Sequence, residues 1–197
     1  MDAFTQDIVA PPAPALDCAR CSRLALYRGG GAPVPSFGPL SARLLIVGMA
    51  PGVAGADRTG GRLFATLRRL GLAREEKARV ALVDARITHA VRCAAPGDLP
   101  EPGEVKSCGV YLAGELGALP NLRAVLALGV LAHAAVLQAC GIPPARTRFS
   151  HGAIHGLPDG LMLADAHQVS RYDGAGGRWT GEMFEAVVLG VLRRLEA

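Results

Sequence analysis

Long apolar runs are missing from this chain of 197 residues, although 50% of the residues are hydrophobic. No run approaches the roughly 18 residues that a membrane span requires. The N-terminus also lacks the basic start and apolar stretch of a signal peptide, because it carries acidic residues and early prolines instead. We therefore expect a cytoplasmic protein with no membrane contact.

Lysine is scarce, with Lys77 and Lys106 as the only two, so arginine supplies nearly all of the positive charge. The formal net charge is +4. An excess of this size suits a phosphate-binding protein, but it also arises from an arginine-rich composition without functional meaning. Charge alone does not decide between the two.

Cysteine is also rare, and its spacing is informative. Without an export signal the thiols should stay reduced, which favours metal ligation or catalysis over disulfides. Cys18 and Cys21 form C-x2-C, Cys93 and Cys108 follow as C-x14-C, and Cys140 lies in an apolar segment typical of a buried residue. A zinc site usually takes its second pair from another tight knuckle, whereas a [4Fe-4S] cluster accepts ligands from separate loops. The spacing favours the cluster, with zinc and unligated core cysteines as alternatives.

Buried-strand patterns alternate with helical patterns along the chain. Continuous apolar runs predict strands over 43–47, 85–91, 124–128 and 161–166, the last one after a hairpin over 151–160. Helical spacing predicts helices over 17–28, 61–73, 130–139 and 181–195. This alternation predicts an α/β fold with three layers, α/β/α, around a central, mostly parallel sheet.

The domain organisation follows from the same patterns. Residues 1–16 are rich in Pro and Ala and read as a flexible tail, and residues 17–197 read as one domain of a monomer. Ligands of such sheets bind beyond the carboxyl ends of the strands. That rule selects the loops at 48–60, 89–98 and 167–177.

Those loops carry a family resemblance. The segments GMAPGVAGADRTG at 48–60, ITHAVRCAAP at 87–96 and SRYDGAGGRWT at 170–180 occur in register with the four cysteines. Together they resemble the iron-sulfur uracil-DNA glycosylases, specifically the type-b (family 5) branch. The resemblance covers nearly the whole chain from Cys18 onward.

The resemblance implies a fold, an activity and a cofactor. It implies a uracil-DNA glycosylase-like fold and a hydrolase of base-excision repair, which flips uracil or another deaminated base out of DNA and cleaves its N-glycosidic bond. It also implies a structural [4Fe-4S] cluster on Cys18, Cys21, Cys93 and Cys108, and a nucleoid-associated location. The cluster would clamp the loop after Cys93 to the N-terminal helix and present basic residues to the DNA backbone, namely Arg20, Arg23, Arg92 and Lys106.

The first loop is expected to hold the base. Glycine lets the backbone approach a planar ring, and the amides of residues 49–53 can point at a base oxygen. Ala50 stands where many other uracil glycosylases place an acidic or amide residue that activates water, and the type-b branch also has an apolar residue there. The expected substrate-binding residues of this loop are Gly48, Met49, Ala50 and Gly52.

The branch's T-G-D element is absent after Arg58, Thr59 and Gly60. Asp57 is the nearest surviving carboxylate, so we expect it to orient water or stabilise the sugar cation. Capping of the following helix is the alternative role for Asp57. Phe64 likewise has two readings, either stacking on the flipped base or core packing next to Leu67.

His89 replaces the asparagine of the family's I-T-N-A-V-R-C context. An amide offers a donor and an acceptor side by side, which match one edge of uracil, whereas an imidazole nitrogen offers only one of them. The sequence therefore does not predict strict uracil selectivity. The alternatives are that His89 binds another base edge, lines an empty pocket, or is a satisfied residue at a strand end.

The third loop departs from the family's His-Pro-Ser motif by one extra residue and no proline. We expect His167 to donate a hydrogen bond to the departing base. Ser170, Arg171 and Tyr172 are expected to enter the duplex and hold phosphate, with a plain surface loop as the alternative. His133 is read as helix surface or core, and His151 and His155 as hairpin residues.

These departures leave a second function open, that of a catalytically impaired iron-sulfur paralogue that binds DNA or senses damage. A small zinc-bound interaction domain would explain only the cysteines.

Overall fold

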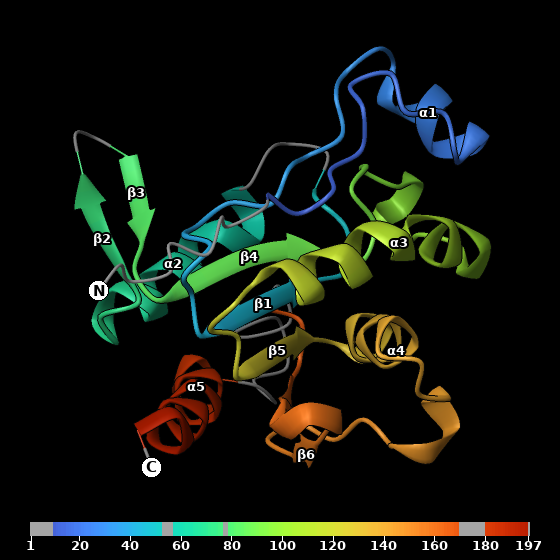
Figure 1. Cartoon of the computed structure of the whole chain (residues 1–197). Helices are drawn as coiled ribbons and strands as arrows, with labels where there is room; N and C mark the ends of the chain where they lie inside the picture. Colours follow the sequence, from blue (N-terminus) through green and yellow to red (C-terminus); the bar gives the residue numbers. More distant parts are fainter. Residues whose placement is uncertain (1–9, 53–56, 77–78, 170–179, 197) are drawn as a thin grey trace, which may run out of the picture.

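The computed structural model describes residues 10–52, 57–76, 79–169 and 180–196, and the side chains at 57–60 and 79 fall outside that description. A five-stranded sheet with the order β4-β1-β5-β7-β6 occupies its centre (Figure 1). Four strands run parallel, and β6 pairs antiparallel with β7 at one edge. The strands are β1 (Leu44–Gly48), β4 (Ala85–His89), β5 (Ala124–Leu128), β6 (Ile154–Gly156) and β7 (Met162–Ala166).

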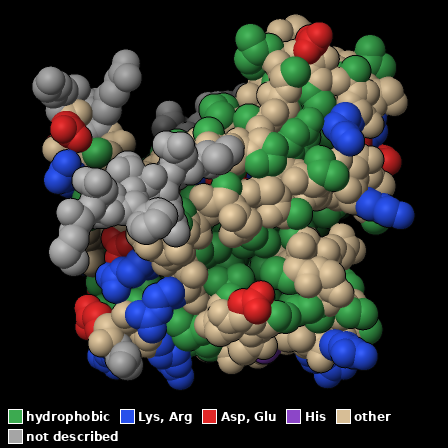
Figure 2. Space-filling view, viewed as in Figure 1, with side chains coloured by type: hydrophobic (Ala, Val, Ile, Leu, Met, Phe, Trp, Pro, Cys, Tyr) green, Lys and Arg blue, Asp and Glu red, His purple; other side chains and the backbone are tan. Residues whose placement is uncertain are grey.

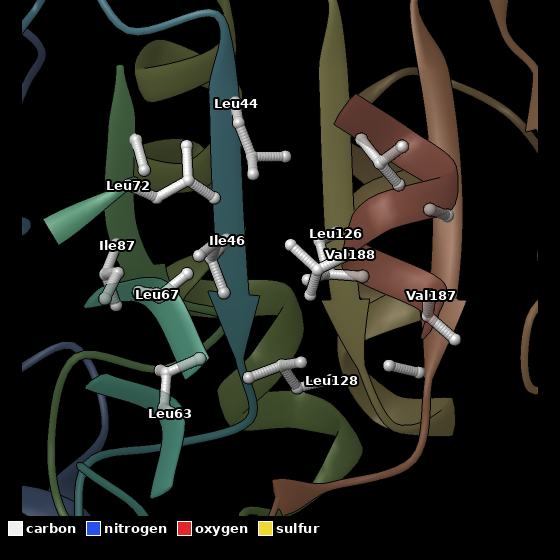
Figure 3. Packing of buried hydrophobic residues seen from close by; sticks show 14 of the residues in the cluster. Leu44, Ile46, Leu63, Leu67, Leu72, Ile87, Leu126, Leu128, Val187 and Val188 are labelled. Carbon is white, nitrogen blue, oxygen red and sulfur yellow. The ribbon is translucent and has the colours of Figure 1, made fainter. Parts of the chain in front are cut away.

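Helices cover both faces of this sheet. Helices α2 (Asp57–Arg69) and α5 (Gly181–Glu196) pack on one face, where Leu63 and Leu67 of α2 lie near Ile46 and Val188 of α5 lies near Leu126 (Figure 3). Helices α1 (Ser22–Arg28), α3 (Pro102–Ala118) and α4 (Val130–Ala139) cover the opposite face. The predicted three-layer α/β/α architecture is confirmed.

The alternation of side chains along the strands divides the core into two. Leu44 and Ile46 of β1 face α2 and α5, whereas Leu45 and Val47 face α3 and α4. All four are fully buried. Because successive strand residues point to opposite faces, a strand covered on both sides must be apolar throughout, and this is why the run could be recognised from the sequence.

The outer edge of β4 is closed by an irregular segment. The backbone of Phe37 exchanges two hydrogen bonds with Ile87 of β4, at 3.1 and 2.9 Å, in an isolated antiparallel bridge. Val34 N also donates to Arg92 O at 2.7 Å. Residues 34–37 therefore lie along the edge of the sheet without forming a sixth strand of their own.

Several elements differ from the predictions. Helix α2 begins at Asp57, four residues earlier than predicted, and ends at Arg69, because Gly71 adopts a positive φ of 75° and the chain turns into a hairpin. That hairpin, β2 (Ala73–Glu76) and β3 (Arg79–Leu82), projects from the body of the molecule (Figure 1) and was not predicted. Helix α3 was missed too, since four glycines and two buried glutamates interrupt any apolar stripe.

The N-terminal part contains a shorter helix than predicted. Helix α1 starts at Ser22, so Cys18 and Cys21 precede it, and Asp17 does not cap it. Ahead of α1, Pro12 lies against Gly114 of α3. In the part of the chain that the structure describes, no helix combines the length and apolarity needed to cross a membrane.

Candidate functional site

A cavity of about 160 Å³ lies where β1 and β4 end, and we call it the strand-end pocket. The register of the two strands brings Gly48 opposite His89, so the loops that follow them are neighbours. The pocket gathers six of the residues expected to bind the substrate, together with others from β5 and the segment after β7. Its lining consists of Val34, Phe37, Gly48, Met49, Ala50, Pro51, Gly52, Leu63, Phe64, Ile87, His89, Leu128 and Gln168.

The first loop is fastened to the loop after β4 by the backbone. Gly48 O accepts a hydrogen bond from Ala90 N at 2.8 Å, and Met49 O accepts one from Val91 N at 3.1 Å. A Cβ atom at position 48 would lie 2.8 Å from Cδ2 of the His89 ring. Glycine is therefore required there so that the imidazole can sit beside the strand end.

His89 is a neutral imidazole in the pocket wall. Burial, reinforced by the charge of Arg92, lowers the pKa of His89 to about 4. Its Nδ1 atom is buried and finds no hydrogen-bond partner among the described residues. A buried polar atom without a partner costs free energy, so a ligand that hydrogen-bonds to it would recover that cost.

For Phe64 the structure bears out the core-packing alternative, and stacking on a flipped base stays a prediction. Its ring lines the pocket, and it also packs against the core on the α2 face. The ring of Phe37 lies 5.9 Å from that of Phe64 at an interplanar angle of 41°. Phe37 and Gln168 were not among the predicted site residues. The loop that contains Gln168 was predicted to lie at the strand ends, but no local pattern in the sequence places the segment around Phe37 there.

His167 follows β7 directly but is not part of the pocket lining, whereas the next residue, Gln168, is. The His167 ring stacks on that of His151, with centroids 5.0 Å apart and an interplanar angle of 16°. His167 N donates to His151 Nδ1 at 3.3 Å. His167 thus stands beside the mouth of the pocket rather than inside it.

Two parts of the predicted site cannot be placed in full. Asp57 starts helix α2, but its side chain lies outside the described residues. Ser170, Arg171 and Tyr172 also lie outside them.

The four predicted ligand cysteines line one narrow cavity, which we call the cysteine site. They come from the segment before α1, the loop after β4, and α3, and the cavity is bordered by Pro14, Leu24 and Tyr111. Among the described residues these sulfurs do not form a compact group of three or more potential ligands of a single ion. Cys140, on α4's C-terminal side, is not part of the site.

Donors point at two of these sulfurs. Arg92 N donates to Cys108 Sγ at 3.4 Å, and Arg28 Nη1 donates to Cys93 Sγ at 3.5 Å. Burial raises the pKa of the Cys21, Cys93 and Cys108 thiols, and in each case a neighbouring sulfur raises it further. Bringing these thiols together as bare thiolates would thus be unfavourable without a cation between them.

Not all of the basic residues near the cysteine site are exposed, as the expected contact with the DNA backbone would require. Arg92 is only 1% exposed and pairs with Glu115 of α3, so it does not face DNA. Arg23 pairs with Glu104 at 2.6 Å. Lys106 is exposed. Figure 2 shows apolar side chains on the surface in the region where Figure 1 places α1 and α3, and Leu26 of α1 is 82% exposed.

A second group of polar side chains was missed by sequence reasoning. His133 of α4, Asp165 of β7 and His155 of β6 form what we call the histidine–aspartate cluster. Asp165 is completely buried and His133 is 2% exposed, so His133 is a core residue. The predicted hairpin over 151–160 brings His155 near Asp165, but nothing in the sequence links either of them to His133 of α4.

With the fold and the pocket in view, the comparison with known families is direct. Residues 35–187 match the model of the uracil DNA glycosylase superfamily. The chain belongs to this superfamily.

Among individual proteins, the chain is similar to several type-5 uracil-DNA glycosylases. The chain is 34% identical over 215 residues to a type-5 uracil-DNA glycosylase of Thermus thermophilus, covering 95% of each chain. It is 36% identical over 181 residues to a type-5 uracil-DNA glycosylase of Pyrobaculum aerophilum, covering 77% of this chain and 78% of the relative. For a type-5 uracil-DNA glycosylase of Mycobacterium leprae the identity is 35% over 173 residues, covering 80% and 76%.

Proposed function

We propose that this protein is a DNA glycosylase of the type-5 branch, which flips uracil or another deaminated base out of DNA and hydrolyses its N-glycosidic bond. It acts in base-excision repair as a cytoplasmic, nucleoid-associated monomer with residues 17–197 as its single domain, against which Pro12 and Pro14 of the preceding segment pack. Membership of the superfamily and the names of the relatives support this proposal.

The observation that carries the proposal is the strand-end pocket. It gathers the expected base-binding residues Gly48, Met49, Ala50, Gly52, Phe64 and His89 at the carboxyl ends of parallel strands. Ligands of open α/β sheets bind at this edge. The aromatic and apolar walls suit the flat faces of a base, and the polar atom of His89 suits its edge.

The reaction requires two kinds of stabilisation. Cleavage leaves negative charge on the departing base and positive charge on the sugar. We assign the first role to His167, which stands beside the pocket mouth, and the second, together with the orientation of water, to Asp57 at the start of α2. Ala50 in the pocket wall provides no carboxylate. Ser170, Arg171 and Tyr172 are assigned to contacts with the DNA.

We further propose that Cys18, Cys21, Cys93 and Cys108 hold a [4Fe-4S] cluster. Four free thiols around one cavity provide a suitable donor set, and a cubane accepts ligands from separate segments more readily than a zinc site does. The N–H donors of Arg28 and Arg92 resemble the hydrogen bonds that tune cluster sulfurs. The bound cluster would supply a structural clamp between the segment before α1, the loop after β4, and α3.

The activity is tested with single-stranded and duplex oligonucleotides that contain uracil, hypoxanthine or xanthine. Alkali-labile abasic sites are expected with at least one base. If no base is released while damaged DNA still binds, the protein is instead an impaired paralogue that recognises damage.

The role of His167 is tested by His167→Ala. We expect the single-turnover rate to fall more than about tenfold, because the charge on the departing base loses its hydrogen-bond donor. An unchanged rate would remove His167 from the mechanism.

The cofactor is tested by colour and iron content. Protein purified without oxygen is expected to be brown and to contain iron, and Cys93→Ser should remove both properties. Cys140→Ser is the matched control and should keep them, because Cys140 lies outside the cysteine site. A colourless preparation that contains zinc would contradict the cluster.

A further inference from the structure

The histidine–aspartate cluster contains a hydrogen-bond pattern that demands an extra proton. His133 Nε2 lies 2.9 Å from Thr147 O, and a backbone carbonyl only accepts, so Nε2 carries a proton. His133 Nδ1 lies 2.7 Å from Asp165 Oδ1. If His133 were a simple neutral ring and Asp165 a carboxylate, two acceptors would face each other at that distance. One further proton must therefore lie between them.

The second carboxylate oxygen is fully engaged as well. Asp165 Oδ2 accepts from Ser150 N at 3.1 Å and pairs with His155 Nε2 at 2.9 Å. An ionised Asp165 with a protonated His133 satisfies every partner in this buried group. The pair is then neutral as a whole, which removes the main cost of burying each charge alone.

A metal ion fits this geometry less well than a proton does. Zinc holds nitrogen and oxygen ligands at about 2.0–2.1 Å, and tetrahedral angles then separate the two ligand atoms by about 3.3 Å. The observed separation of His133 Nδ1 and Asp165 Oδ1 is 2.7 Å. That span is the length of a charge-assisted hydrogen bond.

The cluster fastens the segment 147–155 around the end of β7. Thr147, Ser150 and His155 each bond to His133 or Asp165, and Phe149 and His151 of the same segment contact His167. The Phe149 ring lies 5.6 Å from the ring of His167 and 5.8 Å from that of His133.

The position of His167 therefore depends on the histidine–aspartate cluster indirectly, through the segment 147–155. Asp165 lies on β7, two residues before His167, and accepts a hydrogen bond from Ser150 N, which is next to His151 in the sequence. His151 in turn stacks on the His167 ring and accepts its backbone N–H. Gly129 N also anchors Ala166 O at 2.7 Å, so the strand end itself is fixed.

We propose that Asp165 and His133, sharing one proton in a buried pair, are positioning residues that hold His167 and Gln168 at the mouth of the strand-end pocket. This inference rests on the proposed function of His167. Neither side chain touches the substrate; both act through the segment 147–155.

The decisive variants are Asp165→Ala and Asp165→Asn. An asparagine can donate from its amide to His133 Nδ1 and accept from Ser150 and His155, so it keeps the geometry without the extra proton. We expect Asp165→Ala to lower kcat by about tenfold or more with KM within about threefold, and Asp165→Asn to recover kcat to within about threefold of the wild type. An Asp165→Asn enzyme as slow as Asp165→Ala would overturn the positioning role.

A double-mutant cycle separates positioning from loss of structure. If Asp165 acts through His167, then Asp165→Ala should change the rate of a His167→Ala enzyme by less than about twofold. Equal slowing in both backgrounds would mean that the substitution only damages the fold. Asp84→Asn, which removes the ion pair with Arg43 at the opposite end of the sheet, is the matched control and should leave kcat unchanged.

Two further readouts cover the remaining outcomes. Stoichiometric zinc, nickel or iron in the wild type that is lost in Asp165→Ala, with the brown colour intact, would show a metal site and overturn the proton pair. A wild type that releases no base contradicts the proposed function and not this inference. In that case nitrogen NMR of ring-labelled histidine tests the inference without activity. Both ring nitrogens of His133 should be protonated, and the His167 signals should shift in Asp165→Ala; an unprotonated His133 nitrogen or unshifted His167 signals would contradict the inference.

Discussion

At the scale of single residues, His89 is the most consequential departure in the pocket. Its imidazole is buried, neutral and beside Gly48, and its Nδ1 has no partner among the described residues. An asparagine at this position would present a donor and an acceptor together, whereas the neutral ring presents one at each nitrogen. Base preference in this protein is therefore expected to depend on which nitrogen carries the proton.

The buried state of His89 predicts a dependence of stability on pH. Burial lowers the pKa of His89 to about 4, while the unfolded chain should titrate near the ordinary value of about 6.5. Between these values only the unfolded chain binds the proton, so the free energy of unfolding falls as the pH drops from 6.5 to 4. The loss attributable to His89 is about 3 kcal/mol at pH 4.

Urea unfolding of the wild type and of His89→Asn at pH 7 and pH 4 measures this effect. The variant should lose about 3 kcal/mol less than the wild type over the same range, because asparagine does not titrate. Equal losses would show that the ring is solvated rather than buried.

At this same scale the sequence predicted the pocket better than the histidine–aspartate cluster. Gly48 and His89 end strands that pair in parallel, so their proximity follows from the strand pattern. His133 and Asp165 meet only because helix α4 packs over the end of β7, and the spacing of residues along the chain does not encode that contact.

At the scale of elements, helix α3 depends on a close contact that involves a glycine. A Cβ atom at Gly114 would lie 2.1 Å from Pro12 Cγ, whereas nothing lies within 4 Å of a Cβ at Gly117 on the same helix. The segment before α1 therefore crosses α3 at Gly114, where any side chain would collide with it. Because that segment continues to Pro14 at the cysteine site, the contact bears on the site as well.

Gly114→Ala is expected to lift the N-terminal segment from α3. Limited proteolysis should cleave near Pro12 faster than in the wild type, and iron should be lost more readily on exposure to air. Gly117→Ala is the matched control, and it should slightly stabilise α3, by about 0.5–1 kcal/mol. Equal protease resistance of the two variants would contradict the contact.

The elements also show where sequence reasoning succeeds. Strand β5 and helix α4 have the predicted bounds, because a continuous apolar run and a closing Gly141 mark them unambiguously. Helix α3 was missed because two residues of its buried face are Glu104 and Glu115. Charged residues predict an exposed face, and only the structure shows that each pairs with an arginine. The β2–β3 hairpin was missed because its strands are short and highly charged.

At the scale of the whole molecule, Glu115 joins segments that are distant in sequence. Its carboxylate is 1% exposed and bonds to Arg86 of β4, to Arg92 and to Ser36. Burial acts to raise the pKa of Glu115, but these hydrogen bonds outweigh it and hold the pKa below its ordinary value. Arg92 in turn donates from its backbone to Cys108, so the network extends to the cysteine site.

Glu115→Gln should destabilise the whole fold. It removes the negative charge between two buried arginines, and breaking a buried ion pair in this way costs about 3–5 kcal/mol. Glu75→Gln, which breaks the exposed pair with Arg68, is the control and should change the free energy of unfolding by less than about 1 kcal/mol. Guanidinium unfolding of both variants at pH 7 tests the difference, and similar values for the two would argue against the network.

Phe37 gives the molecule a further property through its backbone. An unpaired strand edge is a template on which another chain can add a strand and begin to aggregate, and natural proteins cover or shorten such edges. Here the bridge from Phe37 to Ile87 covers β4, and the opposite edge strand, β6, has only three residues. The side chain of Phe37 also lines the strand-end pocket. The same residue therefore covers the edge of the sheet with its backbone, which opposes self-association, and shapes the cavity with its ring.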